Sequence, residues 1–176
     1  MVSTKDRKHI VKVLKPYIET MAEDEDAQYV LFTAFDVIEY VLSNCRIFQR
    51  LIFFSDTKLI AKSILPSITQ NVKTLQASAA GRRTVLYSLV PRDRRYYTPS
   101  MIARIAETDG LRAQTSKKSS DIRAAEICSA ASPELLSWVV SDGVEVSRET
   151  GGSLVITEIM LETHGGKSQP LTSIDS

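Results

Sequence analysis

The chain carries RKHIVKVLKPYI at residues 7–18, and the same pattern returns as TKLIAKSILPSI at residues 57–68. In each copy a lysine and apolar residues at helical spacing precede a proline in the same position. A proline placed there ends a short helix and suits the first turn of the next one. The apolar residues that we expect on the buried faces are Ile10, Val13 and Leu14 in the first copy, and Ile60 and Ile64 in the second.

A further apolar helix is expected after each copy. The stretches are QYVLFTAF from Gln28, RTVLYSLV from Arg83 and, much later, SLVITEIM from Ser153. Similarity at intervals of a few tens of residues is typical of stacked helical units. Strand signals are nearly absent; LVITEIM is rich in β-branched residues, but it occupies the helical position of a repeat. The sequence therefore predicts an all-α fold built as a solenoid of helical repeats.

The spacing of the repeats is irregular in one place. The two copies start 50 residues apart, whereas Val30 and Val85 of the following helices lie 55 apart. Removing residues 39–55 would restore a spacing of roughly 36 to 38 residues, which is usual for such units. We therefore interpret 39–55 as an insertion, either a genuine extra helix or translated non-coding sequence.

Helix boundaries are marked clearly in the second half. Thr98 followed by Pro99 predicts an N-cap and a first helical residue, and Ser132 followed by Pro133 predicts the same for another helix. Ser119 or Ser120 is expected to cap the helix between them. The predicted helices are 5–15, 16–23, 26–38, 56–65, 67–77, 81–90, 99–109, 119–130, 132–141 and 151–162.

Composition limits the possible classes of protein. The 176 residues, 43% apolar and 24% charged, are enough for one core or one run of repeats. The net charge is only +1, but the acidic segment 23–26 is separate from the basic segments 82–95 and 112–118. Such separation can create a basic face on a nearly neutral molecule.

Several classes of site are not expected. Two cysteines without a CxxC motif, and no signal peptide, indicate a soluble protein of a reducing intracellular compartment. Residues 40–54 are apolar but too short to span a bilayer. No Cys/His cluster has the spacing of metal ligands, and no GxSxG or GxxxxGK(S/T) motif occurs. We expect no enzyme activity, cofactor, metal, small-molecule substrate or membrane partner.

The most informative functional stretch is GRRTVLYSLVPRDRRYY, residues 81–97. Guanidinium groups bind phosphate oxygens and aromatic faces stack on exposed bases, so this composition indicates a surface for nucleic-acid backbones. The alternative is a solvated turn that keeps a helical domain soluble. The residues predicted to bind nucleic acid here are Arg82, Arg83, Arg92, Arg94, Arg95, Tyr96 and Tyr97, with Lys117 and Lys118 as an extension.

The residues from Gly81 onward resemble a known family. A GRRTVLY helix, a PRD turn, a variable helix and an SKKSSDIR helix follow one another as in the penguin-like C-terminal (CPL) domain of the Puf-A/penguin branch of Pumilio-homology (PUF) proteins. The preceding KDRKHIVKVLKPYIETM and DTKLIAKSILP resemble the Pumilio-like repeats before that domain. The resemblance runs from about Thr4 to Glu162, without residues 39–55.

This resemblance implies a Pumilio/armadillo-like α-solenoid. It divides the chain into repeats at 1–80, the CPL domain at 81–162 and a flexible tail at 163–176. It also implies residence in the nucleolus of the nucleus, work in large-subunit ribosome biogenesis and, in some members, translation regulation. The implied partners are RNA (pre-rRNA or mRNA), DNA as a further ligand, and pre-ribosomal proteins.

Sequence-specific Pumilio repeats read bases with two edge-reading side chains and one stacking side chain. The matching sets in this chain are Gln28, Tyr29 and Phe32; Arg83, Thr84 and Tyr87; and Ser153, Leu154 and Thr157. The first set alone keeps a stacking aromatic, and none keeps a full pair of edge-reading groups. We therefore expect binding without base specificity, with Gln28 and Tyr29 as further contacts, or alternatively a protein-docking scaffold without direct RNA contact.

Overall fold

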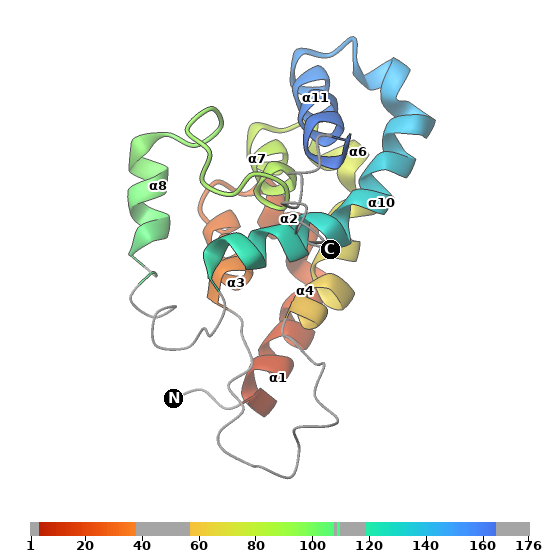
Figure 1. Ribbon diagram of the computed structural model, residues 1–176. Coiled ribbons are helices and arrows are strands. Elements are labelled where there is room, and N and C mark those ends of the chain that lie inside the picture. The colour runs from red at the N-terminus through yellow and green to blue at the C-terminus, as the bar shows by residue number, and fades with distance from the viewer. Residues whose placement is uncertain (1–3, 38–56, 108, 110–118, 165–176) are drawn as a thin grey trace, which may run out of the picture.

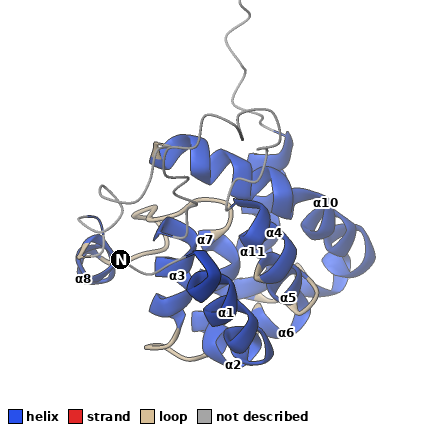
Figure 2. Ribbon diagram, turned by 90° about the horizontal axis from the view of Figure 1, so that it is seen from below, coloured by secondary structure: helices blue, strands red, loops and turns tan. Residues whose placement is uncertain are grey.

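The computed structural model describes residues 4–37, 57–107, 109 and 119–164. Every regular element in these ranges is a helix, which confirms the predicted all-α class for the described residues (Figure 2). None of the described helices is both long and apolar enough to cross a membrane. The predicted insertion at 39–55 and most of the predicted tail at 163–176 lie outside the described residues.

The first repeat follows the predicted order of helix, proline and helix. Its elements are α1 (Thr4–Leu14), the 3-10 turn η1 (Lys15–Tyr17), α2 (Ile18–Glu23) and α3 (Gln28–Val37). Pro16 lies in η1, and Ile18 begins the next helix fully buried. The Asp24 carboxylate accepts the backbone N–H groups of Asp26 and Ala27 at 2.9 and 2.7 Å. These two bonds hold the turn before α3.

The second repeat has the same order but shorter pieces. Its elements are α4 (Thr57–Ser63), α5 (Leu65–Thr69), α6 (Val72–Leu75) and α7 (Ala79–Tyr87). Pro66 lies in the first turn of α5, and the single helix predicted at 67–77 is two short ones. Ser78 caps α7 by accepting the Gly81 N–H at 2.9 Å. A side chain on Gly81 would collide with the backbone of Leu75, so glycine lets α6 and α7 approach closely.

The predicted buried face is correct for the second repeat, but in the first repeat two of the three predicted residues are exposed and the third, Leu14, is half-buried. Ile60 and Ile64 are buried, whereas Ile10 and Val13 are 47% and 52% exposed. Val11 takes the inward position instead, because α1 meets α4 through that side. Among the described helices none covers the face of α1 that carries Ile10 and Val13.

Helix α8 (Pro99–Ala106) begins where the sequence predicted. The Thr98 hydroxyl accepts the Met101 N–H at 3.3 Å, and Pro99 is the first helical residue. Ile105 is buried. The helix stands at one side of the stack, against α3, and is well separated from α10 and α11 (Figures 1 and 2).

The two helices predicted at 119–130 and 132–141 are one helix, α10 (Ser120–Val146), so the predicted start at Pro133 is wrong. Ala131, Leu135 and Trp138 form an unbroken buried stripe, and α10 packs against α4, α5 and α6. Packing of this stripe keeps the chain helical across Pro133, whose ring is exposed. Proline has no backbone N–H to donate to the preceding turn. Next to Pro133 the Ser132 hydroxyl donates to the Cys128 carbonyl at 2.6 Å. The helix changes direction along its length (Figure 1).

Helix α11 (Thr150–His164) closes the described fold. It packs against α10 and α7, with Val155 and Ile159 fully buried. A side chain on Gly152 would collide with Val146, so this glycine allows the tight connection from α10. The result is a stack in which α7 is held between the first repeat and α11.

Candidate nucleic-acid interface

The segment that connects α7 to α8, residues 88–98 and here called the arginine loop, holds five of the eleven predicted binding residues. Hydrogen bonds from the backbone N–H groups of Tyr96 and Tyr97 to the Asp93 carbonyl, both 3.0 Å, fold the loop into a compact turn. The side chains of the four consecutive residues 94–97 therefore have fixed orientations and point in different directions.

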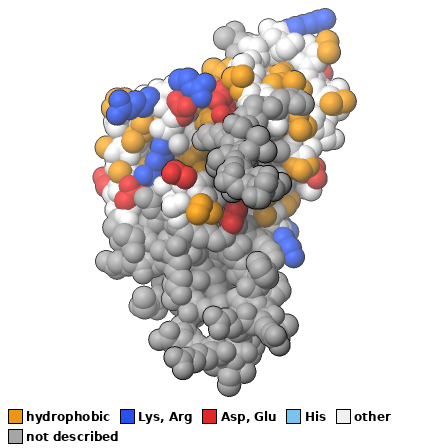
Figure 3. All heavy atoms as spheres, viewed as in Figure 1, with side chains coloured by type: hydrophobic (Ala, Val, Ile, Leu, Met, Phe, Trp, Pro, Cys, Tyr) orange, Lys and Arg blue, Asp and Glu red, His pale blue; other side chains and the backbone are white. Residues whose placement is uncertain are grey.

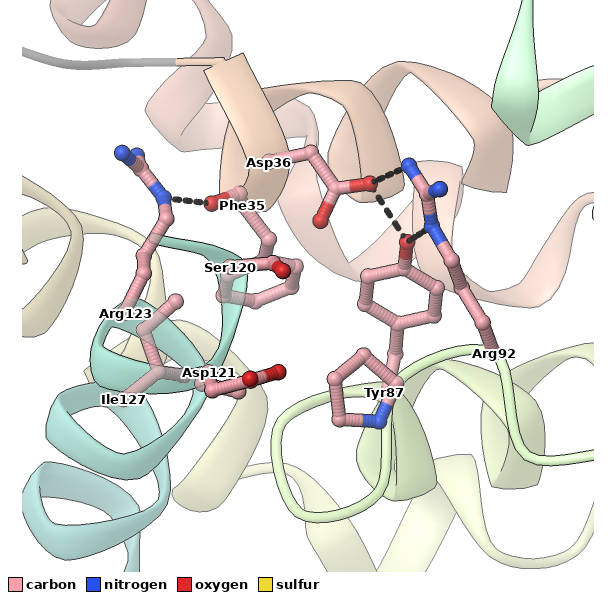
Figure 4. Close-up of a pocket in the computed structure, with 10 residues that line it drawn as sticks. Phe35, Asp36, Tyr87, Arg92, Ser120, Asp121, Arg123 and Ile127 are labelled. Atoms are coloured by element: carbon pink, nitrogen blue, oxygen red, sulfur yellow. Dashed lines mark hydrogen bonds and ion pairs between the residues drawn. The ribbon is translucent and has the colours of Figure 1, made fainter. Parts of the chain in front are cut away.

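Arg92 points into the protein. Its backbone φ of 62° is left-handed, a conformation that is rare for a residue with a long side chain. Its guanidinium donates to Asp109 at 2.8 and 2.7 Å. It also donates to Asp36 at 2.5 Å, and its Nε donates to the Tyr87 hydroxyl at 3.4 Å (Figure 4). The hydrogen bonds to Asp109 raise the pKa of Arg92. Arg92 thus ties the arginine loop to α3 and to Asp109, and its donors face carboxylates rather than solvent.

A cavity of about 230 Å³ lies beside this ion-pair network. Figure 4 shows Arg92, Tyr87 and Asp36 on one side of it and Arg123 on the other, with Arg123 donating to the Phe35 carbonyl at 2.5 Å. Burial, and next the negative charge of Asp36, raise the pKa of Tyr87 far above its ordinary value. Because the cavity carries carboxylates as well as guanidinium groups, it has no single sign of charge that would favour a phosphate.

Arg95 is held by two carboxylates. It donates to Asp93 at 3.0 and 2.8 Å and to Glu158 of α11 at 3.1 and 2.7 Å. Glu158 is 1% exposed, whereas the Arg95 side chain is 53% exposed. Hydrogen bonds from Arg95 lower the pKa of Asp93, which stays ionised. Arg95 therefore joins the arginine loop to α11 and still faces solvent.

The two adjacent tyrosines have different environments. The Tyr96 hydroxyl donates to Glu158 at 2.5 Å, and its ring lies beneath the Arg95 guanidinium, 5.1 Å from the ring centre. Tyr97 is 1% exposed, donates to the Arg83 carbonyl at 2.6 Å and meets Tyr87 and Phe32 edge to face. The prediction that Tyr97 offers an exposed ring to bases is wrong, because the alternating directions of the loop turn it into the core.

Arg94, like Arg95, is exposed as predicted, but its bonding differs from that of Arg95. It is exposed, and within the described part of the chain it makes no hydrogen bond or ion pair. Together with Arg95 and Tyr96 it lines an open groove of about 700 Å³, whose other wall is α8 with Pro99, Ile102 and Ala103. This groove is the place where the structure brings the predicted loop residues together.

The remaining predicted arginines bind within the fold. Arg82 donates to the carbonyls of Gln76 and Ala77 at 2.9 and 3.3 Å. Arg83 reaches Glu25 at 3.4 Å.

The acidic segment 23–26 also binds Arg104 of α8, which meets Asp26 at 2.8 Å. Through Arg83 the basic segment 82–95, separate in sequence, also lies against the acidic segment. On the face seen in Figure 3 cationic and anionic side chains are interspersed.

The predicted base-reading positions on α3 and α7 are mostly internal, whereas Leu154 and Thr157 on α11 are exposed. Gln28 is 1% exposed and donates to the Glu25 carbonyl at 2.7 Å, and Thr84 is fully buried. Phe32 and Tyr87 stack on each other in the core. Tyr29 is half-buried, with the Arg104 guanidinium 4.1 Å from its ring centre. Gln28 is therefore withdrawn from the surface, while Tyr29 remains partly accessible.

Lys117 and Lys118 lie outside the described residues. Over the residues that the structure does describe, no group of three His, Cys, Asp or Glu side chains could hold a metal ion.

Sequence reasoning missed the acidic partners of the loop. Asp36, Asp109 and Glu158 come from three distant segments, and nothing local connects them with Arg92 or Arg95. One signal was available for Glu158, which is the single acid within the apolar run SLVITEIM. A buried carboxylate in such a run needs a cationic or hydrogen-bonding partner.

The chain is similar in sequence to a known domain family and to several known proteins. The CPL (NUC119) domain family model matches residues 77–176. Pumilio homolog 3 of Mus musculus is 31% identical over 166 residues, which cover 94% of this chain and 23% of that protein. Pumilio homology domain family member 6 of Saccharomyces cerevisiae is 27% identical over 90% of this chain and 22% of that protein. The chain thus spans about a quarter of the length of these relatives.

A solved structure gives the same result for the fold. The crystal structure of human Puf-A in complex with DNA matches with a TM-score of 0.75 and 29% identity, over 91% of this chain and 28% of that one. This match confirms the predicted Pumilio-type α-solenoid. The Pumilio-like repeats come first and the CPL domain follows them, as predicted. The chain therefore belongs to the Puf-A/penguin branch of the Pumilio-homology proteins and carries its CPL (NUC119) domain.

Proposed function

We propose that this chain is a helical-repeat module that binds the backbone of RNA, and also of DNA, with little preference for base sequence. The observation that carries the proposal is the match, over 91% of the chain, to a Puf-A structure determined in complex with DNA. Two features of the chain support it. The base-reading positions Phe32 of α3 and Tyr87 of α7 are packed in the core, and the exposed Arg94 lines an open groove.

The biological setting is part of the same proposal. Relatives of this branch give the expectation of a nucleolar protein that acts on pre-ribosomal RNA and associates with pre-ribosomal proteins during large-subunit assembly, with translation regulation as a further role. Because the chain spans about a quarter of its relatives, the other repeats of such a protein would supply additional contacts. Localisation of the tagged full-length protein to nucleoli would test the setting separately from RNA binding.

The test of binding is a salt titration with unrelated RNA and DNA oligomers. Phosphate neutralisation releases counterions, so the affinity should fall steeply with salt and should be similar for all sequences. Arg94→Ala should weaken binding to every oligomer and reduce the slope of log K against log salt by about one. Lys73→Ala is the matched control, because Lys73 is an exposed cation on α6 that pairs with Asp142 of α10, away from the groove.

Loss of affinity in Lys73→Ala equal to that in Arg94→Ala would indicate a general charge effect and would contradict the assignment of the groove. No binding to any oligomer at low salt would overturn the proposal itself.

A second candidate function, a protein-docking scaffold, is favoured by another groove. It measures about 1010 Å³ and lies between the arginine loop, α10 and the end of α11. Leu89, Cys128 and Leu136 contribute apolar surface, and Asp121 and Glu162 lie at its edge. Docking of an apolar helix there would depend weakly on salt, which distinguishes it from phosphate binding. Leu136→Arg should abolish such docking and leave binding to the oligomers intact.

A further inference from the structure

The hydrogen-bond donors of Arg95 are nearly all used within the protein. Its Nε and Nη2 donate to Asp93, and its Nη2 and Nη1 donate to Glu158. These four bonds account for four of the five N–H donors of a guanidinium group. A forked pair of bonds to a phosphate, the usual role of arginine at a nucleic-acid backbone, is therefore not open to Arg95.

The same bonds fix the guanidinium as a flat and rigid group. One side of it lies over the Tyr96 ring, and the ring is anchored in turn by its hydroxyl bond to Glu158. Even so, the Arg95 side chain is 53% exposed. A fixed planar cation with an exposed side is a surface on which nucleobases stack.

The groove beside Arg95 has the other parts of a nucleotide site. Ile102 and Pro99 of α8 give it an apolar wall, and Arg94 at its rim has no bonded partner among the described residues. Its volume of about 700 Å³ lies in the range of about 300–1,000 Å³ usual for small-ligand sites. Arg94 and Arg95 both line this groove, so one can meet a phosphate while the other meets the base of the same nucleotide.

We propose that Arg95, held over Tyr96, is a stacking platform for an unpaired nucleobase and that Arg94 binds the adjoining phosphate, so that the groove takes single-stranded RNA or DNA. This inference rests on the proposed function and makes it more specific. Stacking on a guanidinium plane accepts every base, which agrees with the absence of edge-reading groups. A base paired within a duplex cannot enter the groove without being unstacked.

The first experiment changes the ligand and keeps the protein intact. The affinity of the chain is measured for a short oligothymidine and for an abasic strand with the same number of phosphates. The intact strand should bind about 5- to 150-fold more tightly, which is the usual effect of stacking one base. Equal affinities would overturn the stacking platform but leave backbone binding standing, whereas no binding of either strand would overturn the proposed function.

The second experiment assigns the effect to Arg95. Arg95→Lys keeps the positive charge but removes the planar group. The ratio of the affinity for the intact strand to that for the abasic strand should therefore fall toward one, while the affinity for the abasic strand should equal that of the parent. Arg148→Lys is the matched control, because Arg148 is an exposed arginine just after α10 that does not line the groove, and this variant should keep the ratio. A ratio that is unchanged in Arg95→Lys would contradict the proposal.

A third variant does not depend on the Arg95 bonds. Ala103 is exposed on α8 and lines the groove, so Ala103→Glu adds a carboxylate there without disturbing the core. It should weaken binding of the intact strand at least tenfold, since it both fills the groove and repels phosphates. Unchanged affinity in Ala103→Glu would place the bound strand elsewhere and overturn the inference.

Discussion

The rings of Phe32 and Tyr87 stack with their centres 4.3 Å apart and their planes 13° apart. They occupy corresponding positions in two successive units, on α3 and α7, where a sequence-specific Pumilio repeat would hold an edge-reading side chain. Both rings are buried, and Tyr97 packs edge to face against each of them. Positions that elsewhere read bases here form the contact between neighbouring helices.

Phe32→Ala should therefore reduce stability and leave base preference unchanged. Truncation of a buried phenylalanine costs about 3–5 kcal/mol of the free energy of unfolding, which urea denaturation would measure. Thr157→Ala is the matched control at the corresponding position of α11, where the side chain is exposed, and should change stability by less than about 0.5 kcal/mol. A new base preference in either variant would contradict the assignment of these positions to structure.

Arg92→Ala should also act on stability rather than on binding. It removes the cation between Asp36 and Asp109 and leaves Asp36, which is 13% exposed, with the Tyr87 hydroxyl as its remaining partner in that network. The expected loss is about 2–3 kcal/mol, typical of hydrogen bonds to charged groups. The folded fraction of the variant should bind RNA as the parent does. A large loss of affinity at unchanged stability would show that Arg92 contacts RNA directly.

Local chemistry explains which parts of the fold were predictable. Ser78, Thr98 and Ser119 act as N-caps through bonds to residues three positions away, and Pro66 lies in the first turn of its helix. Such features depend on the nearest few residues, so the sequence shows them directly. The prediction of a helix start at Pro133 failed. Packing of α10 on the second repeat outweighed the local preference of proline for the first turn of a helix.

The candidate site was less predictable for a related reason. The composition of the arginine loop correctly placed Arg94 at the surface, but the role of Arg92, Arg95 and Tyr97 depends on groups that lie far away in sequence. Glu158, for example, is separated from Arg95 by 63 residues. The number of arginines in a sequence segment therefore overestimates the positive charge at the folded surface, because some of them pair with carboxylates from distant segments.

Two glycines make a matched test of close packing. Gly81→Ala should destabilise the protein by about 1–3 kcal/mol, because the added carbon would collide with the Leu75 backbone and push α6 away from α7. Gly143→Ala should stabilise it by up to about 1 kcal/mol, since the new carbon would meet Val139 at an ordinary contact distance of 3.4 Å within a helix. Thermal unfolding of both variants would measure the difference. Equal effects would contradict the close approach at Gly81.

The contribution of the Tyr96 hydroxyl to the free energy of unfolding should disappear at alkaline pH. Burial, and next the hydrogen bond to Glu158, raise the pKa of Tyr96 to about 12. Because the pKa in the folded state is above the value of about 10 in an unfolded chain, the protonated hydroxyl stabilises the fold. This contribution is complete below pH 10 or so and is lost as the pH rises toward 12.

The difference in unfolding free energy between the parent and Tyr96→Phe isolates this effect. It should be constant from neutral pH to about pH 10 and should shrink at higher pH, as the parent loses the proton that bridges Tyr96 and Glu158. Tyr17→Phe, which alters an exposed ring in η1, controls for the loss of a hydroxyl. A difference that stayed constant beyond pH 12 would show that the hydroxyl does not donate to Glu158 and that the Tyr96 ring beneath Arg95 lacks this anchor.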